Sequence, residues 1–457
     1  MVASPKAAPI VGPRCTVPNS DPEHEARARL AIERAVRDIP FYSTSPKVRP
    51  LPRPDAPLAS ELAKIPLLFK HDLRATLPKQ WVPTGRDVKA ELASGKIEFV
   101  ETSGSTGDRT RILWDKGWWL NQEERAFCTN GLVARALSSA STVYREAILT
   151  TPVCGLGSCH AGDLSLAERT DEHRLFLNTR ADPTFWKPTD MDRMLDEMAQ
   201  HDTVGLETDP MYLAVLSRYA GASGRTLPVR GFVALTYGFT SAAHTRGIRR
   251  AYSGPAYQLY GASEVGVLFM EGEDGKLHHC PLTTHVELVP IKVSTPGAEN
   301  VALVVVTTLD RVVQPLVRFV VGDLVQVEAS SPRRFTTVPA LQSVEGRLHD
   351  AVLRPDGALV TAGAIDRALS AMEDIAFYQV NQRTTDRVEI DVVTDSRSDG
   401  ALAEIEARLA PLLLGLAVST RRAAAVAAEP SGKFRIVRRH FPLKLGSLFD
   451  GCDGISL

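Results

Sequence analysis

Glu101-Thr-Ser-Gly-Ser-Thr-Gly-Asp-Arg-Thr-Arg111 is the stretch around which this chain is organised, and it follows an expected short strand at 97–100. Its two glycines allow backbone conformations that other residues avoid and let a ligand approach the main chain closely. Hydroxyl groups add donors, and successive backbone N–H groups in such a turn form a concave anion-binding surface. The stretch predicts a loop that holds a polyphosphate, with an ordinary solvated Ser/Gly loop as the alternative.

Two familiar enzyme classes lack support in the sequence. The loop does not end in the Gly-Lys-Ser/Thr of a Walker A motif, which disfavours an ordinary P-loop NTPase. No Gly-x-Ser-x-Gly elbow occurs, which disfavours an α/β-hydrolase.

Four further motifs follow the loop in a fixed order. They are Tyr260-Gly-Ala-Ser-Glu264, Arg318-Phe-Val-Val-Gly-Asp323, Gly346-Arg-Leu-His-Asp350 and Ser431-Gly-Lys433. In this order and spacing they resemble the core motifs of the adenylate-forming (acyl-CoA synthetase-like) superfamily. Near the N-terminus, Pro40-Phe-Tyr42 and Pro66-Leu-Leu-Phe-Lys-His-Asp-Leu-Arg74 are similar to phenylacetate–CoA ligase-like enzymes in particular. We expect these N-terminal residues to form a surface helix and a capped turn that need not touch ligand.

The resemblance implies roles for individual residues. Glu264 becomes the magnesium-binding carboxylate, and Lys433 becomes the catalytic lysine, so that both are expected to be catalytic. The positions that the resemblance assigns to ATP binding are Thr102, Ser103, Gly104, Ser105, Thr106, Gly107, Tyr237, Gly238, Phe239, Tyr260, Gly261, Ser263, Asp323 and Arg347.

The chemistry of these side chains suits the implied roles. Magnesium prefers oxygen ligands and usually bridges to substrate phosphate, as a carboxylate at Glu264 allows. The two acceptor oxygens of Asp323 suit the vicinal hydroxyls of a ribose. A cation at Lys433 would stabilise the charge that builds up when a carboxylate attacks an α-phosphate and expels pyrophosphate. Each of these residues could alternatively be an ordinary surface or turn residue.

Two positions differ from the family pattern. The hinge that the resemblance implies falls at His349 and Asp350, where the family usually has Asp or Lys at the first position, so a pH-sensitive hinge is expected. The first loop continues Gly107-Asp108-Arg109, and Arg109 is expected to supply its cationic group.

Alternation of strands and helices between 145 and 252 predicts a parallel sheet covered by helices on both faces, with ligands beyond the carboxyl ends of the strands. Helices are expected at 21–38, 117–137, 191–200, 209–219 and 244–252. From 275 to 327 the pattern becomes β-rich, with separate strands at 316–319 and 324–328, and it predicts a smaller antiparallel or barrel-like subdomain. The fold class is therefore α/β. We expect a large domain over 1–348 that holds ATP and the acyl group, and a small mobile α/β domain over 349–457.

Composition sets further limits. The chain has 457 residues and a net charge of −1, which gives no electrostatic reason to expect nucleic acid or an anionic membrane as a partner. No apolar run is long enough to span a membrane, and the N-terminal 18 residues are expected to be a flexible arm instead of a signal peptide. Six cysteines are too sparse for a disulfide framework, so a cytoplasmic location is expected.

Two loops combine cysteine and histidine. They contain Cys154, Cys159 and His160 in one case and His278, His279 and Cys280 in the other. Their spacings match no standard zinc finger. Buried thiols with hydrogen-bonded histidines are the first expectation, and a structural zinc site is the alternative.

The sequence thus favours an enzyme that uses ATP and Mg²⁺ to activate a small carboxylic acid, aromatic or hydrophobic, as an acyl-adenylate. A thiol such as CoA is the expected acceptor. An amine or nitrite acceptor on the same scaffold, or a non-catalytic nucleotide-binding homologue, remain as alternatives.

Overall fold

The computed structural model describes residues 21–44, 53, 55–101, 110–138, 144–152, 161–171, 173–180, 182–328, 338–395 and 400–449. The expected phosphate-binding residues 102–107 lie outside these ranges, as do Arg109, Cys154, Cys159 and His160. None of the described helices is both long and apolar enough to cross a bilayer.

One sheet runs through most of the described chain, and its strand order is β11-β12-β13-β14-β10-β9-β8-β7-β6-β3-β5-β4. The strands are β3 Glu146–Leu149, β4 Thr170–Asp171, β5 Arg174–Phe176, β6 Gly205–Thr208, β7 Phe232–Leu235, β8 Ala256–Ala262, β9 Gly266–Glu271, β10 Leu277–His279, β11 Thr284–Pro290, β12 Val301–Thr308, β13 Phe319–Val327 and β14 Leu341–Arg347.

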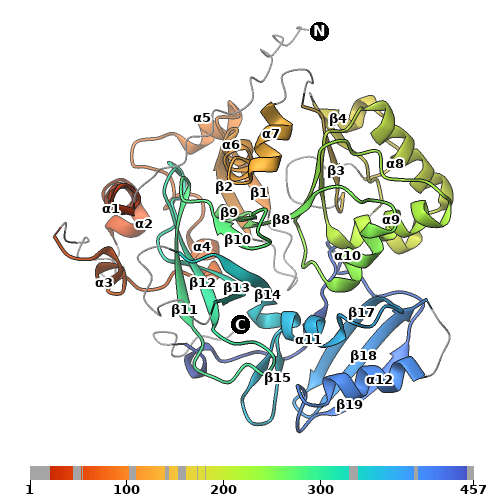
Figure 1. Ribbon diagram of the computed structural model, residues 1–457. Coiled ribbons are helices and arrows are strands. Elements are labelled where there is room, and N and C mark those ends of the chain that lie inside the picture. Colours follow the sequence, from red (N-terminus) through yellow and green to blue (C-terminus); the bar gives the residue numbers. More distant parts are fainter. Residues whose placement is uncertain are drawn as a thin grey trace.

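Strand β8 joins two halves of this sheet, and it lies near the middle of Figure 1. It pairs in parallel with β7 and antiparallel with β9. On the β7 side, strands β7, β6, β3 and β5 are parallel, and β3, β6 and β7 are buried along their whole length. Continuous burial is typical of parallel strands that helices cover on both faces.

Helices connect and cover the strands, and most of them begin with a capping residue or proline. Asp209 caps the ninth helix by accepting a hydrogen bond from Met211 N, and Ser241 caps the tenth through His244 N. The α-helices are α1 Asp21–Asp38, α2 Pro40–Ser43, α3 Leu58–Leu62, α4 Lys70–Thr76, α5 Val88–Ala93, α6 Trp118–Phe127, α7 Gly131–Ser138, α8 Pro188–Gln200, α9 Pro210–Ala222, α10 Ala242–Arg249, α11 Ala362–Leu369 and α12 Gly400–Leu409. Short 3₁₀ helices are η2 Ala167–Arg169, η3 Pro183–Phe185, η4 Leu348–Asp350 and η5 Leu445–Ser447.

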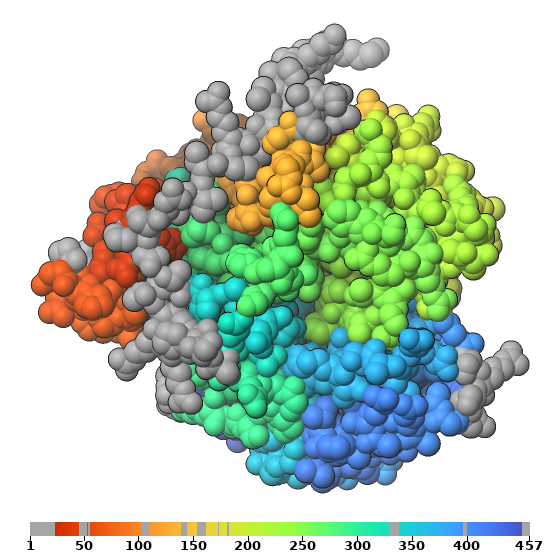
Figure 2. Space-filling model, viewed as in Figure 1, coloured from red at the N-terminus to blue at the C-terminus, as the bar shows by residue number. Residues whose placement is uncertain are grey.

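The C-terminal part forms its own sheet, with the order β19-β18-β17-β20. Its strands are β17 Ile375–Thr384, β18 Arg387–Thr394, β19 Ala417–Arg422 and β20 Val437–Arg439. Arg246 of α10 donates hydrogen bonds to the carbonyls of Ser370 and Met372, and Asp366 of α11 accepts one from Ala242 N. These contacts join the C-terminal part to α10, and the blue and green surfaces lie against each other in Figure 2. Two hairpins complete the fold: β1 Ile97–Glu101 with β2 Arg111–Asp115, and β15 Val352–Leu353 with β16 Leu359–Val360.

The α/β prediction is confirmed, and the structure corrects three details of it. The β-rich region continues the parallel sheet instead of standing apart. The helix expected at 117–137 is broken between Phe127 and Gly131, where Asn130 caps α7 through the N–H groups of Leu132 and Val133. The two strands expected at 316–319 and 324–328 form the single strand β13.

Candidate active site

Glu264 lies in the turn between β8 and β9, and its side chain is almost fully buried, at 4% exposure. Lys70, the first residue of α4, forms an ion pair with it at 2.7 Å between Nζ and Oε1. Burial works to raise the pKa of Glu264, but the charge and the hydrogen bond of Lys70 outweigh burial and lower that pKa below its ordinary value. The carboxylate is therefore ionised, as a metal ligand must be.

Lys70 reaches this turn because the segment before α4 runs along β13. Leu68 N donates to Arg318 O at 2.9 Å, and Val320 N donates to Leu68 O at 2.8 Å. Leu68 and Phe319 thereby form a parallel β-bridge. The sequence suggested that this segment need not touch the site, and the structure places its lysine on the expected magnesium ligand.

The main chain of the Glu264 turn is also held. The Arg311 guanidinium is fully buried and donates to the carbonyls of Glu264 and Leu113. The Trp114 indole donates to Ser263 O at 3.0 Å. A side chain at Gly261 would lie 2.6 Å from the carbonyl oxygen of Gly266, so the hairpin requires glycine there.

Asp323 lies inside β13, directly opposite Arg347 of β14. The Tyr260 hydroxyl donates to Asp323 Oδ2 at 3.0 Å, and Arg347 Nε is 3.7 Å from Oδ1. Burial raises the pKa of Asp323, although Arg347 and Tyr260 act to lower it. Three of the residues that the sequence assigned to ATP binding thus form one contact group, close enough to Glu264 for their charges to interact.

The expected hinge residues His349 and Asp350 follow Arg347 in η4. Burial and the neighbouring arginines lower the pKa of His349 to about 2, so this histidine stays neutral near pH 7. The expectation of a pH-sensitive His349 is therefore wrong. The pKa of Asp350, in contrast, moves toward neutral pH. Burial raises it to about 6, against the attraction of Arg435, which forms an ion pair with Asp350.

Lys433 lies in a loop of the C-terminal part that contacts the parallel half of the large sheet. Thr151, two residues beyond β3, donates through Oγ1 to Ser431 O at 2.7 Å. The Tyr212 hydroxyl of α9 donates to Gly432 O at 2.9 Å. Burial raises the pKa of Asp209 to about 6, and the charge of Lys433 is among the groups that oppose this shift. The lysine thus lies at the carboxyl ends of the parallel strands.

The segment Tyr237-Gly238-Phe239 follows β7 at the same edge of the sheet. Tyr237 has a φ of 65°, a left-handed conformation that is rare for a tyrosine. It makes a side-chain hydrogen bond with Glu207 of β6. A side chain at Gly238 would lie 2.9 Å from Asp209 Oδ2, so this segment and the surroundings of Lys433 are adjacent.

A cavity of about 300 Å³ opens at these strand ends. Its walls include residues from β3 and the segment after it, the end of β6, Tyr237, and α6. Trp114 and Thr151 also line it, so the cavity adjoins both the Glu264 turn and the Lys433 loop. This cavity could not be predicted from the sequence, because its walls come from segments far apart in the chain.

The His278-His279-Cys280 segment does not assemble a metal site from the described residues, among which no group of three metal-binding side chains occurs. His278 hydrogen-bonds Asp274, and His279 hydrogen-bonds Thr284 at 3.2 Å. Cys280 is a buried free thiol.

No protein-family model matches the chain, and no curated protein matches it in sequence. Among solved structures it is similar to a 2-hydroxyisobutyryl-CoA ligase in the postadenylation state in complex with 2-HIB-AMP, with a TM-score of 0.62, 17% identity, and coverage of 93% of this chain and 91% of that one. An open conformation of that ligase, in complex with 2-HIB-AMP and CoA, matches with a TM-score of 0.52 at 17% identity, covering 92% of this chain and 91% of that one. The chain therefore has the fold of adenylate-forming enzymes.

Proposed function

We propose that this protein activates a small carboxylic acid with ATP to an acyl-adenylate and then transfers the acyl group to an acceptor, for which a thiol such as CoA is the first candidate. The observation that carries the proposal is the position of Lys433. Its loop comes from the C-terminal part, yet hydrogen bonds from Thr151 and Tyr212 hold it at the carboxyl ends of the parallel strands, where α/β sheets bind ligands.

In the first half-reaction, a carboxylate oxygen of the acid bonds to the α-phosphorus of ATP. The bond from that phosphorus to the bridging oxygen breaks, and pyrophosphate leaves. Lys433 supplies a cation where negative charge develops on the phosphoryl oxygens. Asp323 accepts hydrogen bonds from the ribose hydroxyls, and Tyr260 and Arg347 hold its carboxylate in place.

The side chains at Glu264 fit a magnesium ion in their donor chemistry. The carboxylate is buried and ionised, and it already neutralises a cation, the Lys70 ammonium. A bound Mg²⁺ would neutralise phosphate charge there. The residues of this chain do the remaining work, because Lys70, Arg311 and Trp114 fix the position of the turn.

In the second half-reaction, the thiol sulfur attacks the acyl carbon, its proton passes to solvent, and AMP leaves. We infer that residues 349–457 move about His349 and Asp350 between the two steps. The same scaffold would serve an amine or nitrite acceptor, so the acceptor is the least determined part of the proposal.

The test is Lys433→Ala, with Lys444→Ala as a matched control because Lys444 is an exposed lysine of the same segment. Acid-dependent pyrophosphate exchange measures the first half-reaction, and transfer from a synthetic acyl-adenylate measures the second. We expect Lys433→Ala to slow the first by roughly 10²–10³-fold and to leave the second largely unchanged. Equal losses in both assays would contradict the moving C-terminal part. A wild-type protein that exchanges pyrophosphate with no acid of a broad panel would contradict the enzyme itself and favour a nucleotide-binding homologue.

A further inference from the structure

The cavity beside Lys433 has an unusual balance of charge. Its carboxylic and basic lining residues, among those that the structure describes, are four acidic groups and one basic group: Glu98, Glu123, Asp171, Glu207 and Arg174. Glu123 and Glu207 are nearly fully buried, at 6% and 2% exposure. Buried carboxylates are normally paired with cations, and here one arginine serves several of them.

A third glutamate stands behind the lining. Glu146 lies on β3, and its neighbour on the same face, Ile148, is the register partner of Glu207 on β6. Glu146 and Glu207 therefore point to the same face of the sheet, which α6 covers with Glu123. The Tyr144 hydroxyl donates to Glu146 at 2.9 Å, and the Trp119 indole donates to Glu123.

The surroundings of these carboxyl groups disfavour their ionised forms. Burial, together with the charge of Glu146, raises the pKa of Glu207 to about 8. Burial, Glu207 and Glu146 likewise raise the pKa of Glu123. Arg174 opposes both shifts, but its guanidinium also pairs with Asp171 at 2.7 Å. The cavity is short of positive charge.

An independent feature also indicates a polar ligand. Thr150 lines the cavity and is 7% exposed, yet its buried hydroxyl has no hydrogen-bond partner in the described part of the protein. A buried hydroxyl without a partner is costly. Aromatic side chains form another part of the walls, with Trp114, Trp119 and Phe176. They would enclose the body of a small acid.

We propose that the acid activated at this site carries a cationic amino group, which binds between Glu123 and Glu207 while its carboxylate faces Lys433. This inference rests on the proposed function, and it adds a cationic group to the aromatic or small hydrophobic acid that the sequence favoured. Thr151 and Tyr237 connect the cavity to the Lys433 loop. The ammonium end of the acid would therefore lie between the two glutamates, and its carboxylate end toward Lys433. An amine acceptor would share the ammonium chemistry, and the experiment separates the two sources.

The first measurement uses wild-type protein and two pairs of acids that differ only in exchanging a terminal methyl for an ammonium group. The pairs are 4-ethylbenzoate with 4-(aminomethyl)benzoate, and heptanoate with 6-aminohexanoate. We expect kcat/KM for pyrophosphate release to be at least roughly 10-fold higher for the amino-substituted acid of at least one pair, because hydrogen bonds to charged groups are stronger than those between neutral groups. Equal or better release with both neutral acids would overturn the inference and leave the proposed function intact.

The second measurement compares Glu207→Gln with Glu404→Gln, a matched change on the exposed face of α12. The first should lower kcat/KM for the amino-substituted acid far more than for its neutral partner and so remove the preference, and the second should leave the wild-type preference unchanged. If amines instead accelerate only transfer from a synthetic acyl-adenylate, the ammonium belongs to the acceptor and the inference fails. If no acid of any kind supports pyrophosphate release, the proposed function fails as well.

A third measurement needs no variant and no turnover. An ammonium beside Glu207 favours the ionised carboxylate, so binding at pH 7 should expel a proton. Titration calorimetry in two buffers of different ionisation enthalpy should detect release of up to about one proton with the amino acid and none with its neutral partner. Equal proton release within a pair would overturn the inference.

Discussion

Glu264 and Glu207 are the same residue type, buried to nearly the same degree at 4% and 2% exposure, yet their pKa values shift in opposite directions. Lys70 lies against Glu264 and lowers its pKa. Glu207 has a tyrosine hydrogen bond and a shared arginine, and its pKa rises to about 8. Burial raises the pKa at both sites, so the presence or absence of a closely paired cation decides the direction of the net shift.

The comparison separates two kinds of buried carboxylate. One has its cation in the fold itself and is ionised before any ligand arrives. The other lines a cavity without an adequate cation, and it gains one only from a ligand. The experiments below remove a cation or a carboxylate and so convert one kind into the other.

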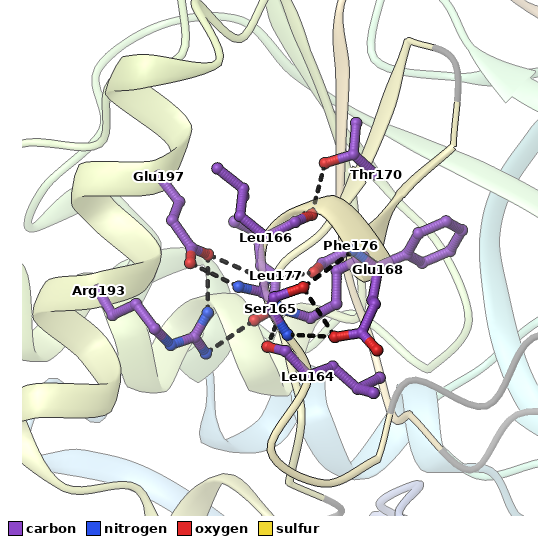
Figure 3. A network of polar contacts seen from close by, with 10 residues as sticks. Leu164, Ser165, Leu166, Glu168, Thr170, Phe176, Leu177, Arg193 and Glu197 are labelled. Carbon is purple, nitrogen blue, oxygen red and sulfur yellow. Dashed lines mark hydrogen bonds and ion pairs between the residues drawn. The ribbon is translucent and has the colours of Figure 1, made fainter.

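The largest effect is expected at a third carboxylate, Glu197 of α8, which has two cations. The buried Arg169 guanidinium pairs with it in bidentate fashion and also donates to the carbonyls of Leu164 and Phe176, in the network of Figure 3. Arg169→Met removes these bonds and should lower the free energy of unfolding by about 3–5 kcal/mol, as measured by urea denaturation. Arg193→Met is the control and should cost less, because Arg193 is 31% exposed and Arg169 would remain. Equal losses would show that burial of the cation does not matter.

An intermediate effect is expected from Lys70→Met, which leaves Glu264 without its ion-pair partner. Because Lys70 is 42% exposed, water replaces part of the interaction, and we expect a loss of about 1–3 kcal/mol at pH 7.5. In the wild type, the stability from the lowered pKa of Glu264 is present above the ordinary pKa of 4.5 and is lost as the pH falls through the folded value. In the variant the loss should shrink toward pH 4, where the carboxyl group is protonated. A loss independent of pH would contradict the ion pair as its cause.

The smallest effect per pH unit is expected from Glu207→Gln, and it concerns the slope of stability against pH. The folded pKa of about 8 exceeds the ordinary 4.5, so the unfolded chain ionises first as the pH rises between these values. Glu207 therefore lowers stability with rising pH, by up to about 1.4 kcal/mol per pH unit. The glutamine variant should be flatter across this window and more stable than wild type at pH 8 in denaturant titrations. Glu404→Gln should keep the wild-type slope.

Much of the fold could be predicted from local patterns. Alternating strands and capped helices between Glu146 and Arg249 gave the parallel sheet, and the helix expected at 21–38 has those bounds in the structure. The sequence predicted two strands around Gly322-Asp323 because glycine and aspartate usually mark turns. Pairing with β12 and β14 overrides that preference, and a φ of 95° at Gly322 lets the strand continue.

The candidate site was predictable where its residues lie in compact motifs, as with Tyr260, Glu264 and Asp323, which the structure brings together. It was not predictable where contacts join distant segments. Lys70 reaches Glu264 across 194 positions because Leu68 pairs with β13. The three clustered glutamates at the cavity, Glu123, Glu146 and Glu207, come from α6, β3 and β6. Each alone resembles an ordinary buried or helical glutamate. Their proximity exists only in three dimensions.

Strand β8 has a consequence for the order in which the chain folds. On one side it pairs with β9, a few residues further along, whereas on the other side β7, β6 and β3 are joined through helical crossovers. Closing a short hairpin loses less chain entropy than closing a crossover. We therefore expect amides of the β8–β9 hairpin to become protected from hydrogen exchange early in refolding, before those of β3. The strand that ends in Tyr260-Gly261-Ala262 would then serve as the template on which the ligand-binding edge is assembled.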